Sequence, residues 1–241
     1  VAWQSINQEP TANGGEGSWG VFARRFTVDP VTGEVYMTMT NNTAAVRPLA
    51  AVDAVNPRLY NDAKTSGSAQ WGNPNGHIIR WRENGDDASA TAFRWDIYLF
   101  AARAGKDPKN VNISGLTKDN DMSSPDGLWF SPTTNICWIQ TDDGAYTDVT
   151  NCMMLAAQPG TVGDGGARTI TNTGTGGATA TQATRIGAAP GANLKRFLVG
   201  PVECEITGVD STPDGRTLFV GIQHPGENGT PAAPSSHWPD S

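Results

Sequence analysis

The stretch that decides the fold runs from Ser124 to Asp142 and reads Ser124-Pro125-Asp126-Gly127-Leu128-Trp129-Phe130-Ser131-Pro132-Thr133-Thr134-Asn135-Ile136-Cys137-Trp138-Ile139-Gln140-Thr141-Asp142. An apolar run at 128–130 leads into a turn at 131–135, where Pro fixes φ and Thr and Asn hydrogen-bond their own backbone. A second apolar run at 136–139 leads out and ends on a carboxylate. The pattern predicts a β-hairpin.

Two other stretches, residues 26–40 and 208–222, repeat this pattern of a short strand, a turn containing proline and a strongly β-forming strand. Pro30, Pro132 and Pro213 mark the repeat. The period is long and uneven, roughly twice the usual length of a β-propeller blade. Repeated hairpins of this kind favour a propeller built from several similar sheets.

The composition supports an all-β protein. Glycine and proline number 28 and 16 among 241 residues, there are eight tryptophans, and 37% of the residues are hydrophobic. Short aromatic strands separated by Gly and Pro turns are typical of sandwiches, barrels and propellers. The net charge is −7, with no basic stripe, so we expect no nucleic-acid partner. The acidity serves either solubility or cation binding by some of the carboxylates.

The cysteines and the hydropathy restrict the class further. Cys137, Cys152 and Cys204 fit no zinc or redox spacing, and Cys137 is expected to be a small core residue. No apolar stretch is long enough to span a membrane. The chain begins at Val1 without an initiator methionine or a signal peptide, so we expect a processed or partial product.

Further strands are predicted along the chain. Residues 77–83 and 91–101 alternate apolar and polar side chains and should form an outer hairpin that completes one blade with the strands before it. Short strands are also predicted at 153–156 and 195–200. Residues 158–190 are dominated by Gly, Thr and Ala, and we expect a long, flexible surface loop there. Residues 1–241 are thus expected to be a single domain of about three blades, part of a larger propeller, since a closed ring takes about four to eight.

Eight stretches in series resemble the PhoX family of secreted bacterial alkaline phosphatases. They are Thr32-Gly33-Glu34-Val35-Tyr36-Met37-Thr38-Met39-Thr40-Asn41-Asn42, Gly76-His77-Ile78-Ile79-Arg80-Trp81, Ser124-Pro125-Asp126-Gly127-Leu128-Trp129, Trp138-Ile139-Gln140-Thr141-Asp142, Arg196-Phe197-Leu198-Val199-Gly200-Pro201, Cys204-Glu205-Ile206-Thr207-Gly208, Thr212-Pro213-Asp214-Gly215-Arg216-Thr217-Leu218-Phe219 and Gln223-His224-Pro225-Gly226-Glu227. The order matches as well, and the resemblance covers about residues 26–241.

The resemblance implies a six-bladed β-propeller of which this chain is the C-terminal half. It implies export by a twin-arginine signal, hence a periplasmic or secreted protein, and hydrolysis of phosphate monoesters. It also implies a cofactor of Ca²⁺ and Fe³⁺. The remaining half of the propeller, in the same precursor or as a separate chain, would carry the family's iron-bridging cysteine, so no cysteine of this chain inherits that role.

The resemblance assigns two metal ligands. The family's Pro-Asp-Gly-Leu-Trp motif places a metal-binding aspartate on Asp126, and its Cys-Glu-(Val/Ile)-Thr-Gly motif places a carboxylate on Glu205. Before the first repeat, where the family has Arg-Pro-Glu, this chain has Phe22, Ala23 and Arg24. Arg24 or Arg25 can still reach a phosphate, but neither can bind a metal cation, so the catalytic and phosphate-binding residues stay open.

Plainer interpretations stand beside these assignments. An aspartate in a Pro-Asp-Gly turn is by default a turn former, which we expect of Asp214 and weigh against metal binding for Asp126. Glu205 lies between apolar strand residues, where an unpaired carboxylate is costly to bury, which favours a functional role. Residues 119–121 are expected to be a solvated loop. His77 and His224 are expected to be hydrogen-bonded structural residues.

Two functions follow. The first is an exported, metal-dependent phosphomonoesterase acting on phosphate-ester small molecules. Ca²⁺ and Fe³⁺ both favour oxygen ligands, and phosphoryl transfer depends on positive charge around the phosphate oxygens. The second is a non-catalytic, calcium-stabilised extracellular propeller with a binding or structural role, which the missing Arg-Pro-Glu favours.

Overall fold

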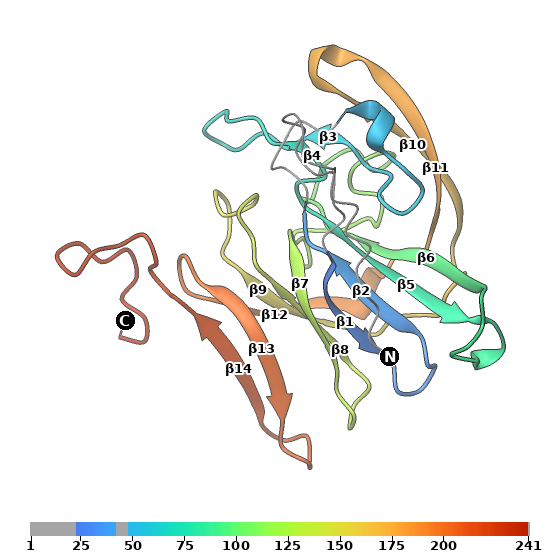
Figure 1. Ribbon diagram of the computed structural model, residues 1–241. Helices are drawn as coiled ribbons and strands as arrows, with labels where there is room; N and C mark the ends of the chain where they lie inside the picture. The colour runs from blue at the N-terminus through green and yellow to red at the C-terminus, as the bar shows by residue number, and fades with distance from the viewer. Residues whose placement is uncertain (1–22, 42–47, 241) are drawn as a thin grey trace, which may run out of the picture.

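The computed structural model describes residues 23–41 and 48–240, and its regular elements there are β-strands and short 3-10 turns (Figure 1). The strands are β1 (Ala23–Val28), β2 (Val35–Met39), β3 (Tyr60–Asn61), β4 (Trp71–Gly72), β5 (His77–Glu83), β6 (Phe93–Phe100), β7 (Pro125–Phe130), β8 (Cys137–Thr141), β9 (Met153–Ala157), β10 (Gly166–Thr173), β11 (Thr179–Ile186), β12 (Leu194–Val199), β13 (Glu205–Ser211) and β14 (Leu218–Gln223). The 3-10 turns are η1 (Leu49–Ala51), η2 (Asn84–Asp86), η3 (Thr175–Gly177) and η4 (Gly191–Asn193). The prediction of an all-β protein is confirmed. Within the described residues no helix has the length and hydropathy that a membrane span requires.

The first sheet has the strand order β1-β2-β5-β6-β11-β10. Its first four strands are consecutive antiparallel neighbours and form one blade, with the predicted hairpin of β5 and β6 on the outside. The β10–β11 hairpin is attached to β6 through a single parallel pair, Ile186 with Ile97. The outer hairpin at 77–83 and 91–101 is therefore confirmed.

The second sheet, β12-β9-β8-β7, contains the hairpin from which the sequence analysis started. Strands β7 and β8 pair antiparallel around the predicted turn, where the backbone N–H of Ser131 donates to the carbonyl of Ile136 at 2.9 Å. Asn135 takes the left-handed conformation, φ 55°, which asparagine tolerates better than most residues. The residue types of this turn thus produced the hairpin as expected.

The third sheet consists of β13 and β14 alone. The three sheets fan out side by side, and β7 lies beside β1 on one side and beside β13 on the other (Figure 1). The sheets do not close into a ring, so the chain is a partial propeller, as predicted. Apolar side chains stay exposed at both ends of the fan, with Phe26 63% exposed on β1 and Phe219 61% exposed on β14.

The hydrophobic core fills the spaces between neighbouring sheets. Between the first two sheets, Tyr36 packs edge-on against Tyr98 and Phe130, with ring centroids 5.5 and 5.2 Å apart. A second cluster joins the second sheet to the third through Met154 and Ile206. Burying one face of each sheet against the next is what holds the fan together.

Residues 158–190 are a correction to the sequence analysis. They contain the β10–β11 hairpin, paired in register from Gly166 with Ile186 to Thr173 with Thr179. Threonine is a strong strand former, and a period-2 pattern places Ile170 and Asn172 on the buried face. The expectation of a flexible loop was wrong because the Gly-rich composition concealed this alternation.

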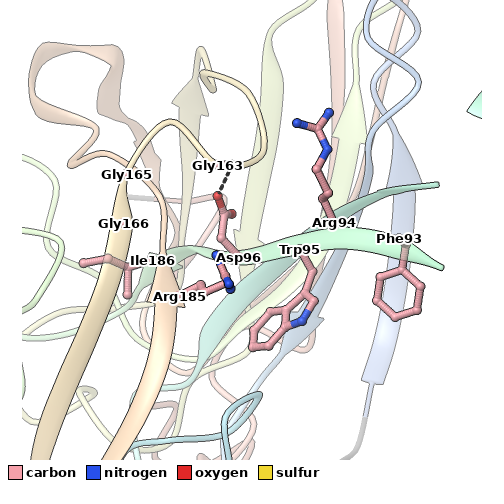
Figure 2. Close-up of a pocket in the computed structure, with 9 residues that line it drawn as sticks. All are labelled: Phe93, Arg94, Trp95, Asp96, Gly163, Gly165, Gly166, Arg185 and Ile186. Atoms are coloured by element: carbon pink, nitrogen blue, oxygen red, sulfur yellow. Dashed lines mark hydrogen bonds between the residues drawn. The ribbon is translucent and has the colours of Figure 1, made fainter. Parts of the chain in front are cut away.

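The segment before β10 is also bonded to the first sheet. Gly163 donates its backbone N–H to Asp96 at 2.7 Å (Figure 2). Arg80 pairs with Asp96 and Asp164 at 2.7 and 2.6 Å. Arg80 and Asp96 are almost fully buried. The tip at residues 163–166 is therefore anchored to the first sheet by a buried ion-pair network.

Asn172 provides a test of the hairpin. Its side chain accepts from the backbone N–H of Leu59 at 2.5 Å and donates to the carbonyl of Pro57 at 2.9 Å, and it is fully buried. We expect Asn172→Ala to lower the free energy of unfolding by about 2–4 kcal/mol, because two buried backbone groups lose their partners.

The matched control is Thr171→Ala, because Thr171 is an exposed neighbour whose backbone N–H bonds to Asn110 and survives the substitution. Urea unfolding of the two variants measures the difference. Equal stability of the two would contradict the docked hairpin.

Candidate metal centre

Three carboxylates meet where strands of the second and third sheets begin or end. One carboxylate oxygen each from Asp126, Asp142 and Glu205 lies within 4.8 Å of the other two. Asp126 is 3% exposed, and the Glu205 side chain is 12% exposed. Three like charges so close together are unfavourable unless a proton or a cation offsets them.

Strand pairing explains the convergence. Asp126 is the second residue of β7, and Asp142 directly follows β8. Because β7 and β8 are antiparallel and Pro125 pairs with Thr141, the start of one strand meets the end of the other. Strand β13 lies beside β7 and begins with Glu205. The three carboxylates therefore reach the same end of two neighbouring sheets.

The backbone around Asp126 is irregular. The β7–β8 register shifts between Pro125 and Leu128, which is a bulge at Asp126 and Gly127. A Cβ on Gly127 would lie 2.2 Å from the side-chain oxygen of Gln140, so any larger residue there would require the Gln140 side chain to move. The hydroxyl of Thr38 donates to the carbonyl of Asp126 at 3.0 Å. These contacts fix the direction in which the Asp126 side chain points away from the strand.

The electrostatics of Glu205 indicate uncompensated negative charge. Burial raises the pKa of its carboxyl, and the nearby charges of Asp142 and Asp126 raise it further. A side-chain hydrogen bond with Asp126 acts in the same direction, while His224 lowers the pKa. The imidazole Nε2 of His224 lies 3.9 Å from a Glu205 oxygen. The cluster is thus arranged to hold either a shared proton or a cation.

The donor set suits the ions that the sequence analysis named. All three donors are carboxylate oxygens, which Ca²⁺ takes at six to eight positions and Fe³⁺ also favours. The structure brings the two residues predicted to bind metal, Asp126 and Glu205, into one cluster. Their binding of a metal stays a prediction.

Sequence reasoning gave Asp142 no role. The signal that could have found it is its place at the end of the strand that pairs with the Asp126 strand, since hairpin partners bring such ends together.

Other expected site residues lie elsewhere. Asp214 accepts from Thr212 and from the backbone of Arg216 inside its own turn, as a turn former does. His77 is buried, with its ring nitrogens 2.8 Å from the Asn73 amide and 2.9 Å from the carbonyl of Val55. These contacts agree with a structural role for both residues.

The solvated loop expected at 119–121 was wrong for two of its residues. Asn120 and Asp121 are buried, and Asp121 pairs with Arg196 at 2.5 Å and accepts from the Tyr146 hydroxyl at 2.5 Å. Arg196 lies on β12, far away in the sequence, so local composition gave no sign of this ion pair.

The start of β1 bears on the phosphate site. Phe22 lies outside the described residues, and β1 begins at Ala23, which pairs with Met39. Arg24 and Arg25 belong to this strand, which lies beside β7. Their contact with a phosphate stays a prediction.

A separate pocket of about 350 Å³ lies between β6, the 163–166 segment and β11 (Figure 2). Its lining is Phe93, Arg94, Trp95, Asp96, Gly163, Gly165, Gly166, Arg185 and Ile186. None of the three clustered carboxylates lines it, and its one carboxylate, Asp96, is committed to Arg80 and Gly163. This pocket is therefore distinct from the candidate metal centre.

Comparisons with known proteins confirm the family resemblance seen in the sequence. The family model described as alkaline phosphatase PhoX matches residues 22–226. Among solved structures, the chain resembles Pseudomonas fluorescens PhoX in complex with vanadate, a transition state analogue, with 31% sequence identity and a TM-score of 0.61. The similarity covers 91% of this chain and 31% of that chain, less than the half expected from the sequence. A search of curated proteins gives no match.

The raised pKa of Glu205 predicts a pH dependence in the absence of divalent and trivalent cations. The folded state keeps the Glu205 proton to higher pH than the unfolded state does. We therefore expect this group to make the free energy of unfolding fall as the pH rises above about 4.5, the ordinary pKa of the carboxyl.

Glu205→Gln should remove this contribution and stabilise the metal-free chain at neutral pH. Urea unfolding in the presence of a chelator, over a series of pH values, measures it. The control Glu227→Gln neutralises an exposed carboxylate and should keep the original slope. If the free energy of unfolding of Glu205→Gln kept the same pH dependence, the neighbours of this carboxyl would not raise its pKa.

Proposed function

The chain belongs to the PhoX family of alkaline phosphatases, and we propose on that premise that it forms part of an exported, metal-dependent phosphomonoesterase. The observation that carries the proposal is the convergence of Asp126, Asp142 and Glu205 at the end of two neighbouring sheets. The sequence motifs that carry two of these carboxylates are also those that the family resemblance assigns to metal binding.

In this proposal the three carboxylates hold a metal centre of Ca²⁺ and Fe³⁺. When bound, these ions supply the positive charge that stabilises the oxygens of a transferring phosphoryl group. Asp126 and Asp142 anchor the centre to the second sheet, and Glu205 anchors it to the third. Because Ca²⁺ takes six to eight oxygen ligands, three carboxylates do not complete its shell.

The remaining ligands would come from other parts of the protein. The chain spans 31% of the Pseudomonas fluorescens PhoX chain, and its sheets do not close into a ring. The rest of the propeller, from the same precursor or from a separate chain, is the partner that this arrangement requires. Residues 1–241 then act as one domain, the C-terminal part of that propeller.

Substrate binding needs a cationic group beside the metal centre. Arg24 or Arg25 fills this role in the proposal, because β1 lies beside the strand that carries Asp126. The substrates would be small phosphate monoesters, and the compartment would be the periplasm or the exterior of the cell. Three buried cysteines, all free thiols, lie outside the proposed ligand set.

A second function is a non-catalytic propeller stabilised by calcium, with a binding or structural role outside the cell. The observation that favours it is the sequence Phe22-Ala23-Arg24, which lacks the glutamate of the family's Arg-Pro-Glu. Without that carboxylate the centre loses one metal ligand, whereas a calcium site on the three clustered carboxylates can persist.

Elemental analysis of the protein, isolated without chelators, separates the two functions. Calcium together with iron is expected for the phosphatase. Calcium alone would select the structural propeller. The absence of both metals would mean that this part of the protein alone, or a site without the glutamate, does not assemble the centre.

The metal-binding assignment predicts the effect of two substitutions. We expect Asp126→Asn and Glu205→Gln each to weaken Ca²⁺ binding by about 100-fold or more, because each removes a charged ligand. Titration calorimetry on the whole protein, with the rest of the propeller present, measures this, and its hydrolysis of a chromogenic phosphate monoester should be lost in parallel.

The matched control is Asp214→Asn, because Asp214 occupies the same Pro-Asp-Gly context in an exposed turn. It should bind Ca²⁺ like the unaltered chain. If hydrolysis survived both substitutions of the clustered carboxylates, the assignment of the site would be wrong.

A further inference from the structure

Ser124, two residues before Asp126, has an unusual backbone. Its φ is 52°, in the left-handed region, and it is fully buried. A residue with a Cβ pays a steric penalty for this conformation, so the surrounding structure must enforce it. Glycine, asparagine or aspartate would occupy such a position more easily.

Two backbone hydrogen bonds hold Ser124 between the sheets. Its N–H donates to the carbonyl of Asn75 at 2.8 Å, and its carbonyl accepts from the N–H of Asp142 at 3.1 Å. Asn75 precedes β5 of the first sheet, whereas Asp142 follows β8 of the second. The second bond connects the segment that leads into Asp126 directly to one of the other clustered carboxylate residues.

The Ser124 side chain adds a third connection. Its hydroxyl donates to the Asp143 carboxylate at 2.8 Å and accepts from the Asn41 amide at 3.2 Å. Asp143 in turn accepts from the backbone N–H groups of Ala145 and Tyr146 at 2.8 and 2.7 Å. The turn that follows Asp142 is thereby tied to Ser124 through both backbone and side chain.

We propose that Ser124 is a positioning residue that sets the distance between Asp126 and Asp142 and so tunes the cation affinity of the cluster. The inference rests on the proposed function, because it assigns Ser124 a role towards the same metal centre. The left-handed backbone turns the chain into the bulge at Asp126, and the bonds to Asp142 and Asp143 fix the opposite strand end.

A matched residue separates positioning from general stability. Ser131 lies just beyond the other end of β7, is also buried, and also bonds through its hydroxyl, 3.1 Å from the Thr133 hydroxyl and 3.3 Å from the N–H of Thr134. It lies at the turn of the hairpin, away from the carboxylates. Loss of either hydroxyl should lower the melting temperature, but only Ser124 should affect cation binding.

The experiment is Ca²⁺ titration calorimetry on the whole protein, with the rest of the propeller present, and on its variants, at a temperature at which circular dichroism shows each to be folded. Ser124→Ala is expected to weaken Ca²⁺ binding about tenfold, because it removes a hydrogen bond to a carboxylate and keeps the backbone penalty. Ser131→Ala is expected to lower the melting temperature and leave the Ca²⁺ affinity unchanged.

Ser124→Gly covers the case in which the alanine variant does not fold. Glycine lacks the CH₂OH group and so loses the hydroxyl, but it adopts the left-handed backbone freely, so a smaller loss of about fivefold is expected. Unchanged affinity in the folded Ser124 variants would overturn the proposal, as would an equal loss in Ser131→Ala. If the unaltered whole protein bound no Ca²⁺, the proposed metal centre itself would fail, an outcome distinct from the other two.

Discussion

The packing of β7 between β1 and β13 is the constraint on which the rest of the structure depends. Neighbouring sheets bury apolar faces against each other, and this burial fixes how far the strands of one sheet are shifted along those of the next. The strand ends that carry Asp126 and Glu205 are brought together as a result. Hydrophobic contacts elsewhere in the fan therefore offset the mutual repulsion of the carboxylates, as is common at functional sites.

The turn chemistry of the sequence was sufficient to locate the three hairpins, because Pro132 and Asn135 act locally. The clustering of Asp126 with Glu205 followed from motifs carried by a family resemblance, which places both near strand starts. Asp142 was missed because its position depends on strand pairing and on a bulge, neither of which a local pattern reveals.

The errors share a physical cause. The hairpin within residues 158–190 has a local strand pattern, but it is docked through Asn172, which bonds to the backbone at Pro57 and Leu59, more than a hundred residues earlier. Asp121 is buried because Arg196 reaches it from another strand. Long-range partners of this kind change a polar, loop-like segment into an ordered one, and composition within a window contains no trace of them.

The two-stranded third sheet is less buried than its neighbours: β14 has no fully buried residue, and in β13 only Ile206 is. As long as no further sheet covers it, such a sheet opens locally at a lower free energy than the rest of a domain. Glu205 belongs to this sheet, while Asp126 and Asp142 belong to the well-packed second one. A cation shared by the three carboxylates would link the second sheet to the third. The β13–β14 hairpin would then open only together with release of the ion.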